Sequence, residues 1–280
     1  MIKYAWATDI HLDFMSNQGV IDFAESLVSQ NPDGIFLTGD ISIAPSLTYH
    51  LSAIEKVIQR PIYFVLGNHD YYKGRIDEVR KQMHELSNMS QYLRYMPTTP
   101  YVVLSPTTAV VGHDGWYDAR FGAGAQSQFR MTDWHAIYDF WTLNKSHAHV
   151  SASGHYDMTA IVTLAQKLAH EGVTSVANGI KAAVRYHKNI IVLTHFPPFA
   201  ESHIHNGKIG DDHAMPWFTS KVMGDMLLQA AHAHPNVNFT ILAGHTHGAY
   251  NNRIVKNLHV LVGGAEYGQP GLQQMIDITG

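Results

Sequence analysis

Five short polar clusters in this sequence each follow an apolar run at the point where that run ends. In chain order they are Asp9-Ile10-His11, Gly39-Asp40, Gly67-Asn68-His69-Asp70, His195, and Gly244-His245-Thr246-His247. In open α/β sheets, the loops beyond the carboxyl ends of the strands meet in one crevice. We therefore expect these side chains, although they are far apart in the sequence, to converge on one site.

The converging donors point to a pair of metal ions. Two Asp, one Asn and four His at these positions give seven oxygen and nitrogen ligands, which is more than one closed tetrahedral zinc accepts. Shared between two cations, with one carboxylate bridging, they leave each ion about four protein ligands and room for water or substrate. Mixed nitrogen and oxygen donors suit manganese, iron, zinc or cobalt, so the pattern predicts two divalent metal ions without selecting among these four.

The spacing within two of the clusters also favours a shared site. In an extended segment, residues i and i+2 project to the same side. We therefore expect Asp9 with His11, and His245 with His247, to face the metals together. Glycines in three of the clusters allow the backbone to turn sharply beside a crowded centre.

The elements that must position these clusters alternate between apolar β-rich runs and helical patterns, which is typical of βα units around a buried sheet. The runs expected as buried strands are residues 4–7, 34–38, 62–66, 101–111, 190–193 and 239–242. Apolar residues recur at helical spacing over 20–28, 76–86, 158–168 and 222–230. For the third of these helices, Asp157 is expected as the N-cap and Gly172 as the stop.

The tail of the chain differs from this alternation. Short apolar runs at 249–254, 258–262 and 272–278 are separated by turn residues, which suggests antiparallel strands that close a sheet. The segment from residue 112 to residue 156 is the least regular part and is rich in Gly, Trp, Tyr and His.

The ordered set Asp-x-His, Gly-Asp, Gly-Asn-His-Asp, a single His and Gly-His-x-His resembles the calcineurin-like metallophosphoesterase superfamily. The motifs span Asp9 to His247, and all five are complete. The resemblance implies a four-layer αββα sandwich, in which two mixed β-sheets pack face to face with helices outside. It implies one domain over residues 1–280, with an irregular insert or cap at about 112–156.

The resemblance also implies a role for each motif residue. Three residues would hold the first metal, and they are Asp9, His11 and His247. Three more would hold the second metal, namely Asn68, His195 and His245, and Asp40 would bridge the two ions. His69 would face the scissile phosphate without binding a metal, and Asp70 would hydrogen-bond His69 to fix its tautomer.

These roles imply a metal-dependent phosphoric ester hydrolase, a phosphatase or phosphodiesterase. It would hydrolyse phosphate mono- or diesters with a metal-bridging hydroxide as the nucleophile. The alternative is a non-catalytic metal-binding scaffold or protein-interaction module on the same fold. That alternative is expected where ligands or the equivalent of His69 have been lost, and here none is lost.

Five residues outside the motifs are candidate substrate contacts. Trp116, Tyr117 and Arg120 follow a predicted buried strand and would contact the alcohol side of the substrate, or else the two aromatic residues pack under a long loop. His203 and His205 follow His195 closely and would line the substrate cleft.

Composition limits the partners of this 280-residue chain. The net charge is −4 and no long basic run exists, so an extended nucleic-acid surface is not expected and a small phosphate ester fits better. There are no cysteines, which excludes disulfides and thiolate nucleophiles. The N-terminus lacks the features of a signal peptide, and no apolar run has the length of a membrane span, so a cytoplasmic protein with no membrane contact is expected. The sequence indicates no oligomeric state.

Overall fold

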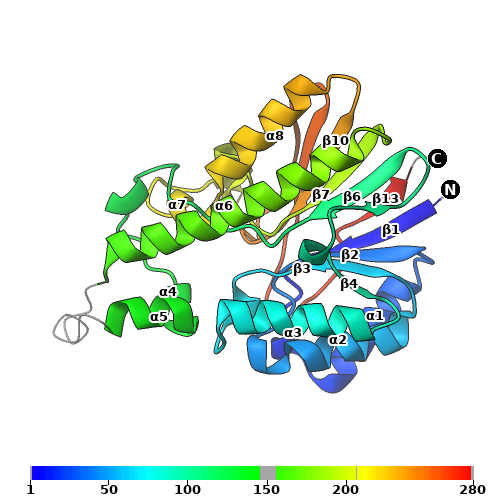
Figure 1. Ribbon diagram of the computed structural model, residues 1–280. Coiled ribbons are helices and arrows are strands. Elements are labelled where there is room, and N and C mark those ends of the chain that lie inside the picture. Colours follow the sequence, from blue (N-terminus) through cyan, green and yellow to red (C-terminus); the bar gives the residue numbers. More distant parts are fainter. Residues whose placement is uncertain (1, 146–155, 206, 279–280) are drawn as a thin grey trace.

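The computed structural model describes residues 2–145, 156–205 and 207–278. Two β-sheets lie face to face, and helices cover the outer face of each (Figure 1). The helices on the first sheet are α1 (Asn17–Val28), α2 (Ala44–Ile58) and α3 (Ile76–Met89). The helices on the second sheet are α6 (Met158–Ala183) and α8 (Lys221–Ala233). This is the αββα sandwich that the sequence motifs imply.

The first sheet has the strand order β13-β1-β2-β3-β4. Its parallel strands are β1 (Ile2–Ala7), β2 (Gly34–Thr38), β3 (Ile62–Val65) and β4 (Leu93–Tyr95). β13 (Gln274–Ile278) pairs with β1 in the antiparallel direction. Because β1, β2 and β3 are parallel neighbours, the loops that follow them leave the sheet at the same edge.

The second sheet has the order β11-β12-β10-β7-β6-β5. Its parallel strands are β6 (Thr108–Gly112), β7 (Asn189–Leu193), β10 (Asn238–Ala243) and β12 (Leu258–Val262). Two antiparallel strands complete its edges, β5 (Val102–Val103) and β11 (Tyr250–Val255). The short remaining elements are α4 (Asp133–Ala136), α5 (Tyr138–Lys145), α7 (Met215–Phe218), and the hairpin of β8 (Ile204–His205) and β9 (Lys208–Ile209).

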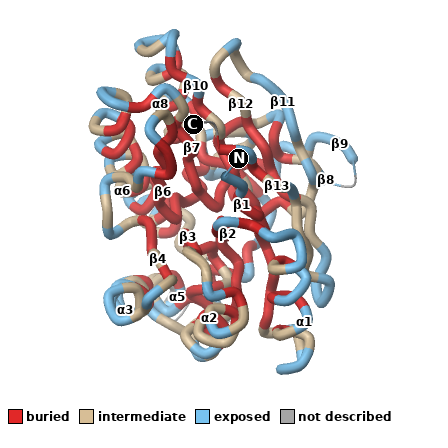
Figure 2. The backbone as a smooth tube through the Cα atoms, turned by 90° about the vertical axis from the view of Figure 1, so that its right-hand side faces the viewer, coloured by how far each residue is buried: buried red, intermediate tan, exposed pale blue. Residues whose placement is uncertain are grey.

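Large apolar side chains from both sheets fill the space between them. Tyr4 stacks on Phe36 with ring centroids 4.6 Å apart. Leu193 and Leu242 of the second sheet belong to the same buried cluster. Figure 2 shows the central strands as the buried middle of the molecule, whereas the outer helices and the edge strands β8, β9 and β11 are partly or largely exposed. Burial of apolar surface between the sheets therefore holds together the two sets of loops that carry the motifs.

Helix α6 continues past the stop that the sequence predicts. It ends at Ala183, and Gly172 lies inside it. A Cβ atom at Gly172 would lie 3.0 Å from the Cα atom of Gly115, so this glycine allows the helix to pack closely on the loop after β6. The glycine therefore serves helix packing, and the prediction that it ends the helix is wrong.

Two strand predictions also need correction. Residues 101–111 form the β5–β6 hairpin rather than one strand, with a turn closed by a hydrogen bond from the Thr108 N–H to the Ser105 carbonyl. The tail strands do not close a single sheet. β12 pairs with β10 in parallel, whereas β13 pairs with β1 on the other sheet.

In the described part of the chain, no helix is both long and apolar enough to cross a membrane.

The substitution Gly179→Ala tests the close packing of α6. Alanine in a helix interior is about 1 kcal/mol more favourable than glycine, but here the new Cβ would overlap the backbone carbonyl oxygen of Pro100. We expect a net loss of roughly 1–3 kcal/mol in the free energy of unfolding, measured by urea denaturation. Gly19→Ala in α1 is the matched control, because its methyl group would meet mainly the flexible end of Met15. A Gly179→Ala protein as stable as this control would contradict the packing argument.

Candidate metal centre

The motif side chains converge where the carboxyl ends of the two sheets meet. One group of possible ligand atoms comes from Asp9, His11, Asp40 and His247, and a second group comes from Asp40, His195 and His245. Within each group, the ligand atoms lie within 4.8 Å of one another. The side-chain oxygen of Asn68 lies 3.2 Å from His195 Nε2. All seven predicted donors are thus together, and Asp40 is common to both groups.

The backbone reaches this arrangement through left-handed conformations. φ is 49° at Asp9, 40° at His11, 49° at Asp40, 72° at His245 and 56° at His247. Such conformations cost about 1–3 kcal/mol each for residues other than glycine and persist where the surroundings enforce them. The expectation of an extended i, i+2 geometry is therefore wrong, although both members of each pair do reach the site.

Hydrogen bonds between loops enforce these turns. The Asp9 N–H donates to the carbonyl of Gly39 at 3.0 Å, and the His11 N–H donates to the carbonyl of Asp40 at 3.0 Å. From the second sheet, the His245 N–H donates to the Asp9 carboxylate at 2.9 Å. Gly67 is needed because a Cβ there would overlap the Asp40 carboxylate. These contacts pack the loops against one another and fix the position of the donors relative to each other.

Two of the histidines have one ring nitrogen held by a backbone carbonyl. His195 Nδ1 lies 2.8 Å from the Thr38 carbonyl oxygen, and His245 Nε2 lies 3.1 Å from the Trp217 carbonyl oxygen. A carbonyl oxygen can only accept a hydrogen bond, so each of these nitrogens carries a hydrogen. When the ring is neutral, the lone pair is therefore on the other nitrogen. This is how proteins orient histidine ligands of metals.

The donor set fits cations. His195 Nε2 faces two oxygen acceptors, Asp40 Oδ1 at 3.4 Å and Asn68 Oδ1 at 3.2 Å. His11 Nε2 faces His247 Nε2 at 3.2 Å, while His11 Nδ1 is buried and has no hydrogen-bond partner. Facing lone pairs repel one another unless a proton or a metal ion lies between them. Divalent cations would resolve both contacts.

The pKa values of these histidines agree with that assignment. Burial lowers the pKa of His11 to about 3 and lowers the pKa of His245 well below its usual range, so both rings are neutral at pH 7. Burial opposes the charging of His195, but the Asp40 and Asp9 carboxylates prevail and raise its pKa to about 9. A position beside two carboxylates that attracts a proton this strongly also attracts a metal ion.

His69 lies beside the two donor groups and belongs to neither. Its ring stacks on Tyr72 with centroids 4.2 Å apart, and its Nε2 lies 3.9 Å from Asp40 Oδ2. The side chain is 18% exposed, whereas the Asp40 side chain is 2% exposed. His69 therefore presents its imidazole to the space above the donors.

Asp70 has a different partner from the one the sequence predicts. Its Oδ1 accepts from the N–H groups of Ile41 and Ser42 at 2.9 and 2.8 Å, and its Oδ2 accepts from the Gly67 N–H at 2.8 Å. The carboxylate thus ties the loop after β2 to the loop after β3. These three backbone bonds direct it away from His69, and the predicted tautomer-fixing contact is corrected accordingly.

Asp133 contacts a predicted metal donor, and the sequence pattern does not reveal it. It is fully buried, and its Oδ1 accepts from Asn68 Nδ2 at 2.9 Å and from the Tyr72 hydroxyl at 2.7 Å. The bond to Nδ2 turns the Asn68 oxygen toward the donors. Asp133 lies in the irregular segment and follows no predicted strand, so neither motif nor periodicity singles it out.

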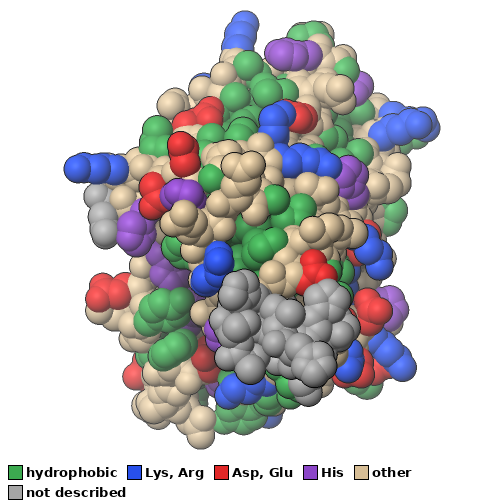
Figure 3. Space-filling model, turned by 90° about the vertical axis from the view of Figure 1, so that its left-hand side faces the viewer, with side chains coloured by type: hydrophobic (Ala, Val, Ile, Leu, Met, Phe, Trp, Pro, Cys, Tyr) green, Lys and Arg blue, Asp and Glu red, His purple; other side chains and the backbone are tan. Residues whose placement is uncertain are grey.

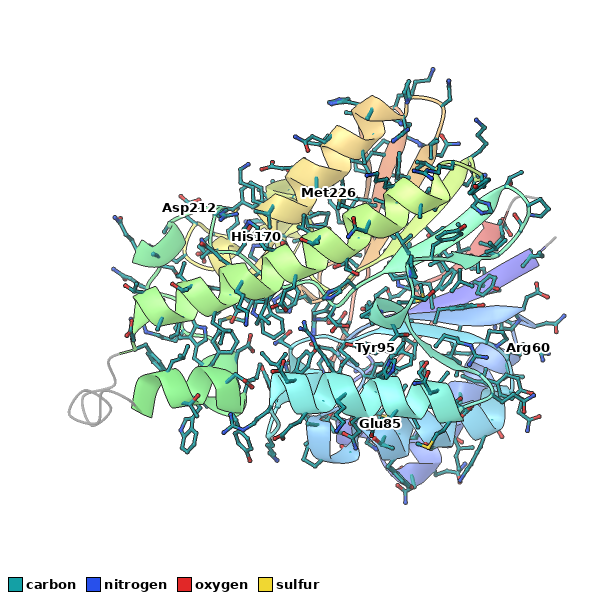
Figure 4. All side chains as sticks on the ribbon, viewed as in Figure 1. Arg60, Glu85, Tyr95, His170, Asp212 and Met226 are labelled. Carbon is teal, nitrogen blue, oxygen red and sulfur yellow. The ribbon has the colours of Figure 1, made fainter. Side chains whose placement is uncertain are left out.

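Asp114 positions the metal-binding loops without touching the donors. Its carboxylate accepts from the Leu66 N–H at 2.8 Å and from the Tyr71 and Tyr95 hydroxyls, both at 2.6 Å. Figure 4 marks Tyr95 beside α3, at the end of β4. The Asp114 carbonyl accepts from the His195 N–H at 3.1 Å. Asp114, in the loop after β6, therefore binds both the loop after β3 and the loop after β7.

A cleft of about 190 Å³ opens above the donors. Its lining residues are Asp40, Asn68, His69, Tyr72, Phe129, Arg130, Met131, Thr132, Phe218, His245, His247 and Tyr267. A larger hollow of about 580 Å³ lies around Lys3 and Arg60 and contains none of the motif residues. The smaller cleft is the one that adjoins the donors.

The five candidate substrate contacts do not line this cleft. Trp116 and Tyr117 are fully buried, so their aromatic rings pack in the core as the structural alternative requires. Arg120 is exposed outside the cleft lining. His203 is buried and stacks on Phe218 at 4.9 Å, and His205 is exposed on β8. We therefore correct the assignment of Trp116 and Tyr117, because a fully buried ring offers a substrate no surface.

The substitution Asp70→Asn tests the structural role of this carboxylate. An amide places an NH₂ group against a backbone N–H that now donates to an oxygen, so we expect a loss of about 1–3 kcal/mol in the free energy of unfolding. Urea denaturation of metal-free protein measures it. Asp33→Asn is the matched control, since Asp33 accepts a backbone hydrogen bond at an exposed position. Equal stability of the two variants would refute the loop-tying role.

The substitution Asp133→Ala tests the orientation of Asn68. The variant loses the shorter of the two hydrogen bonds that Asn68 Nδ2 donates and keeps only the one to the Tyr72 hydroxyl at 3.3 Å. We expect the affinity for one of two metals to fall about 10–100-fold, as for other groups that orient ligands. Cobalt titration followed by visible absorption measures the binding. Asp139→Ala is the control, because Asp139 accepts from the Ile76 N–H and does not contact a donor. Unchanged affinity for both ions would limit Asp133 to packing.

Comparison with known proteins identifies the family. The family model for calcineurin-like phosphoesterases matches residues 2–249, and no curated protein sequence matches the chain. A solved dimetal phosphatase from Danio rerio is 12% identical with a TM-score of 0.55, covering 93% of this chain and 86% of that one. Phosphopantetheinyl hydrolase from Mycobacterium tuberculosis is 16% identical with a TM-score of 0.56, covering 94% of this chain and 89% of that one.

At these identities, the two likenesses concern the fold. The family model, by contrast, spans most of the chain and every motif at the site. The protein therefore belongs to the calcineurin-like phosphoesterases.

Proposed function

We propose that this protein hydrolyses phosphate mono- or diesters with two divalent metal ions. The observation that carries the proposal is the buried Asp40 carboxylate, which is shared by two groups of nitrogen and oxygen donors beneath an open cleft. A site built only to hold metals for stability would be closed by protein ligands, whereas this one opens to solvent. An open dinuclear centre is one that can bind a phosphate ester and a water nucleophile together.

The donors divide naturally into two sets. In the first, Asp9, His11 and His247 would hold one ion; in the second, Asn68, His195 and His245 would hold the other; and Asp40 would bridge them. Bound there, the ions would supply a water nucleophile of lowered pKa and positive charge for the phosphoryl oxygens. Manganese, iron, zinc and cobalt all suit these donors.

His69 would act on the substrate from the wall of the cleft. Its partly exposed imidazole is fixed by stacking on Tyr72 and by the hydrogen bond from its backbone N–H to Asp40 Oδ1 at 2.9 Å. From there the ring can donate a proton to the leaving oxygen or a hydrogen bond to the phosphoryl group. General acid help of this kind contributes about 10²–10⁴ in rate.

The proposed substrate is a small ester rather than a long polyanion. The volume of the cleft is small, at about 190 Å³. On the face drawn in Figure 3, Lys and Arg side chains are scattered among acidic and neutral ones rather than gathered in a stripe. Binding an extended nucleic acid relies on many such cations in contact with phosphates.

Metal content and turnover together test the proposed function. We expect about two manganese ions per chain by elemental analysis and chelator-sensitive hydrolysis of p-nitrophenyl phosphate or bis-p-nitrophenyl phosphate. Asp40→Asn should lose both metal and turnover, because the bridging carboxylate is gone. His69→Ala should keep the metal and lose about 10²-fold or more in kcat.

The non-catalytic alternative gives a different result in the same experiment. A metal-binding scaffold would retain two ions and hydrolyse neither ester at any pH. Loss of metal in His69→Ala would instead make His69 a ligand and remove it from the proposed role.

A further inference from the structure

Aromatic rings stand at both ends of the donor pair. At the first metal group, the Tyr267 ring lies 4.4 Å from the His11 ring and 5.0 Å from the His247 ring. At the second group, the Phe218 ring lies 4.8 Å from the His245 ring, and Phe129 packs edge-on against Phe218 at 5.5 Å. A molecule bound over the metals therefore has an aromatic wall on either side.

These walls are not fully packed against protein. Tyr267 is 48% exposed and Phe129 is 36% exposed, although both line the cleft. Phe14 is 57% exposed and extends the first wall, with its ring 5.0 Å from that of Tyr267. Large aromatic side chains left open beside a polar centre provide surface for a ligand to cover.

The protein itself places little positive charge at the cleft lining. Among the described residues that line it, Arg130 is the only Lys or Arg. The Arg130 guanidinium lies over the rings of Trp134 and Tyr156 at 6.0 and 5.9 Å and donates to the backbone carbonyls of Ser127 and Phe129. Its position is thus set by the protein, and no pair of cations is arranged to clamp a second phosphate.

We infer that Tyr267, Phe129 and Phe218 form an aryl subsite. The substrate would then contain a single phosphate group, esterified to an alcohol that carries a planar aromatic ring. This inference rests on the proposed function, because the metal pair would hold the phosphoryl group. The three protein rings would bind the aromatic part of the ester by stacking and edge contacts. Such contacts depend little on which aromatic ring the substrate carries. An aliphatic alcohol would leave both walls in contact with water.

Paired substrates and variants of the manganese-loaded protein test the subsite. We expect Tyr267→Ala to raise the KM for 1-naphthyl phosphate about fivefold more than the KM for glycerol phosphate, and Phe129→Ala to act in the same direction. Tyr267→Phe keeps the ring and should keep the wild-type ratio of the two constants. Comparing variants on each ester separately cancels the difference in leaving-group reactivity. Tyr186→Ala, at an exposed tyrosine outside the cleft lining, is the control.

Binding measurements separate this inference from the proposed function. Phenylphosphonate and methylphosphonate cannot be hydrolysed, and calorimetry should show tighter binding of the phenyl compound to the wild type, with the preference reduced in Tyr267→Ala. If the wild type hydrolyses neither these two monoesters nor bis-p-nitrophenyl phosphate, the proposed function fails, and the phosphonate preference still decides the subsite. If turnover is observed but Tyr267→Ala changes both esters and both phosphonates equally, the aryl subsite is overturned and the phosphoesterase stands.

Discussion

The site depends on how closely the two sheets bring their carboxyl edges together around one carboxylate. Asp40 leaves the first sheet, yet its oxygens lie 3.4 Å from His195 of the second sheet and 3.9 Å from His11 of the first. It is 1% exposed, and a carboxylate that is buried to this degree requires positive charge nearby. Burial keeps His11 and His245 neutral, so they do not supply that charge. His195 supplies part of it, because the Asp40 and Asp9 carboxylates raise its pKa to about 9 against the effect of burial. Cations bound between the loops would supply more, so metal binding would stabilise the folded loops.

The sequence predicts this convergence well because strand ends are easy to recognise. Each motif follows an apolar run, and parallel strands place their following loops at one edge. The expected backbone conformation is nevertheless wrong. Left-handed turns, rather than extended backbone, bring Asp9 with His11, and His245 with His247, to the site. Left-handed φ values at Asp and His arise from contacts between loops. The spacing of residues in the sequence does not predict these contacts. Motif recognition therefore identifies the residues but not the strain that positions them.

Buried carboxylates outside the donor set were harder to predict. Asp70 stands next to His69 in the sequence but binds three backbone N–H groups, because the loops after β2 and β3 leave those groups without other partners. Asp133 and Asp114 orient the site from the chain beyond β6. Which polar group a buried carboxylate meets is decided by tertiary packing, so a sequence pattern cannot supply the pairing. Trp116 illustrates the converse, since an aromatic side chain near a motif is buried in the core.

The walls of the cleft come from segments that carry no motif, and this division has a physical basis. Chemistry at phosphorus makes the same demands whatever alcohol is attached, so the metal-binding loops can be shared by enzymes with different substrates. In the proposed function, selection of the alcohol would fall to residues that line the cleft, such as Phe129 and Tyr267. In this protein, the wall segment of residues 129–132 is followed directly by Asp133, which orients Asn68. Because one short stretch forms a wall and orients a predicted metal donor, a change in its path would alter the proposed substrate selection and metal binding together.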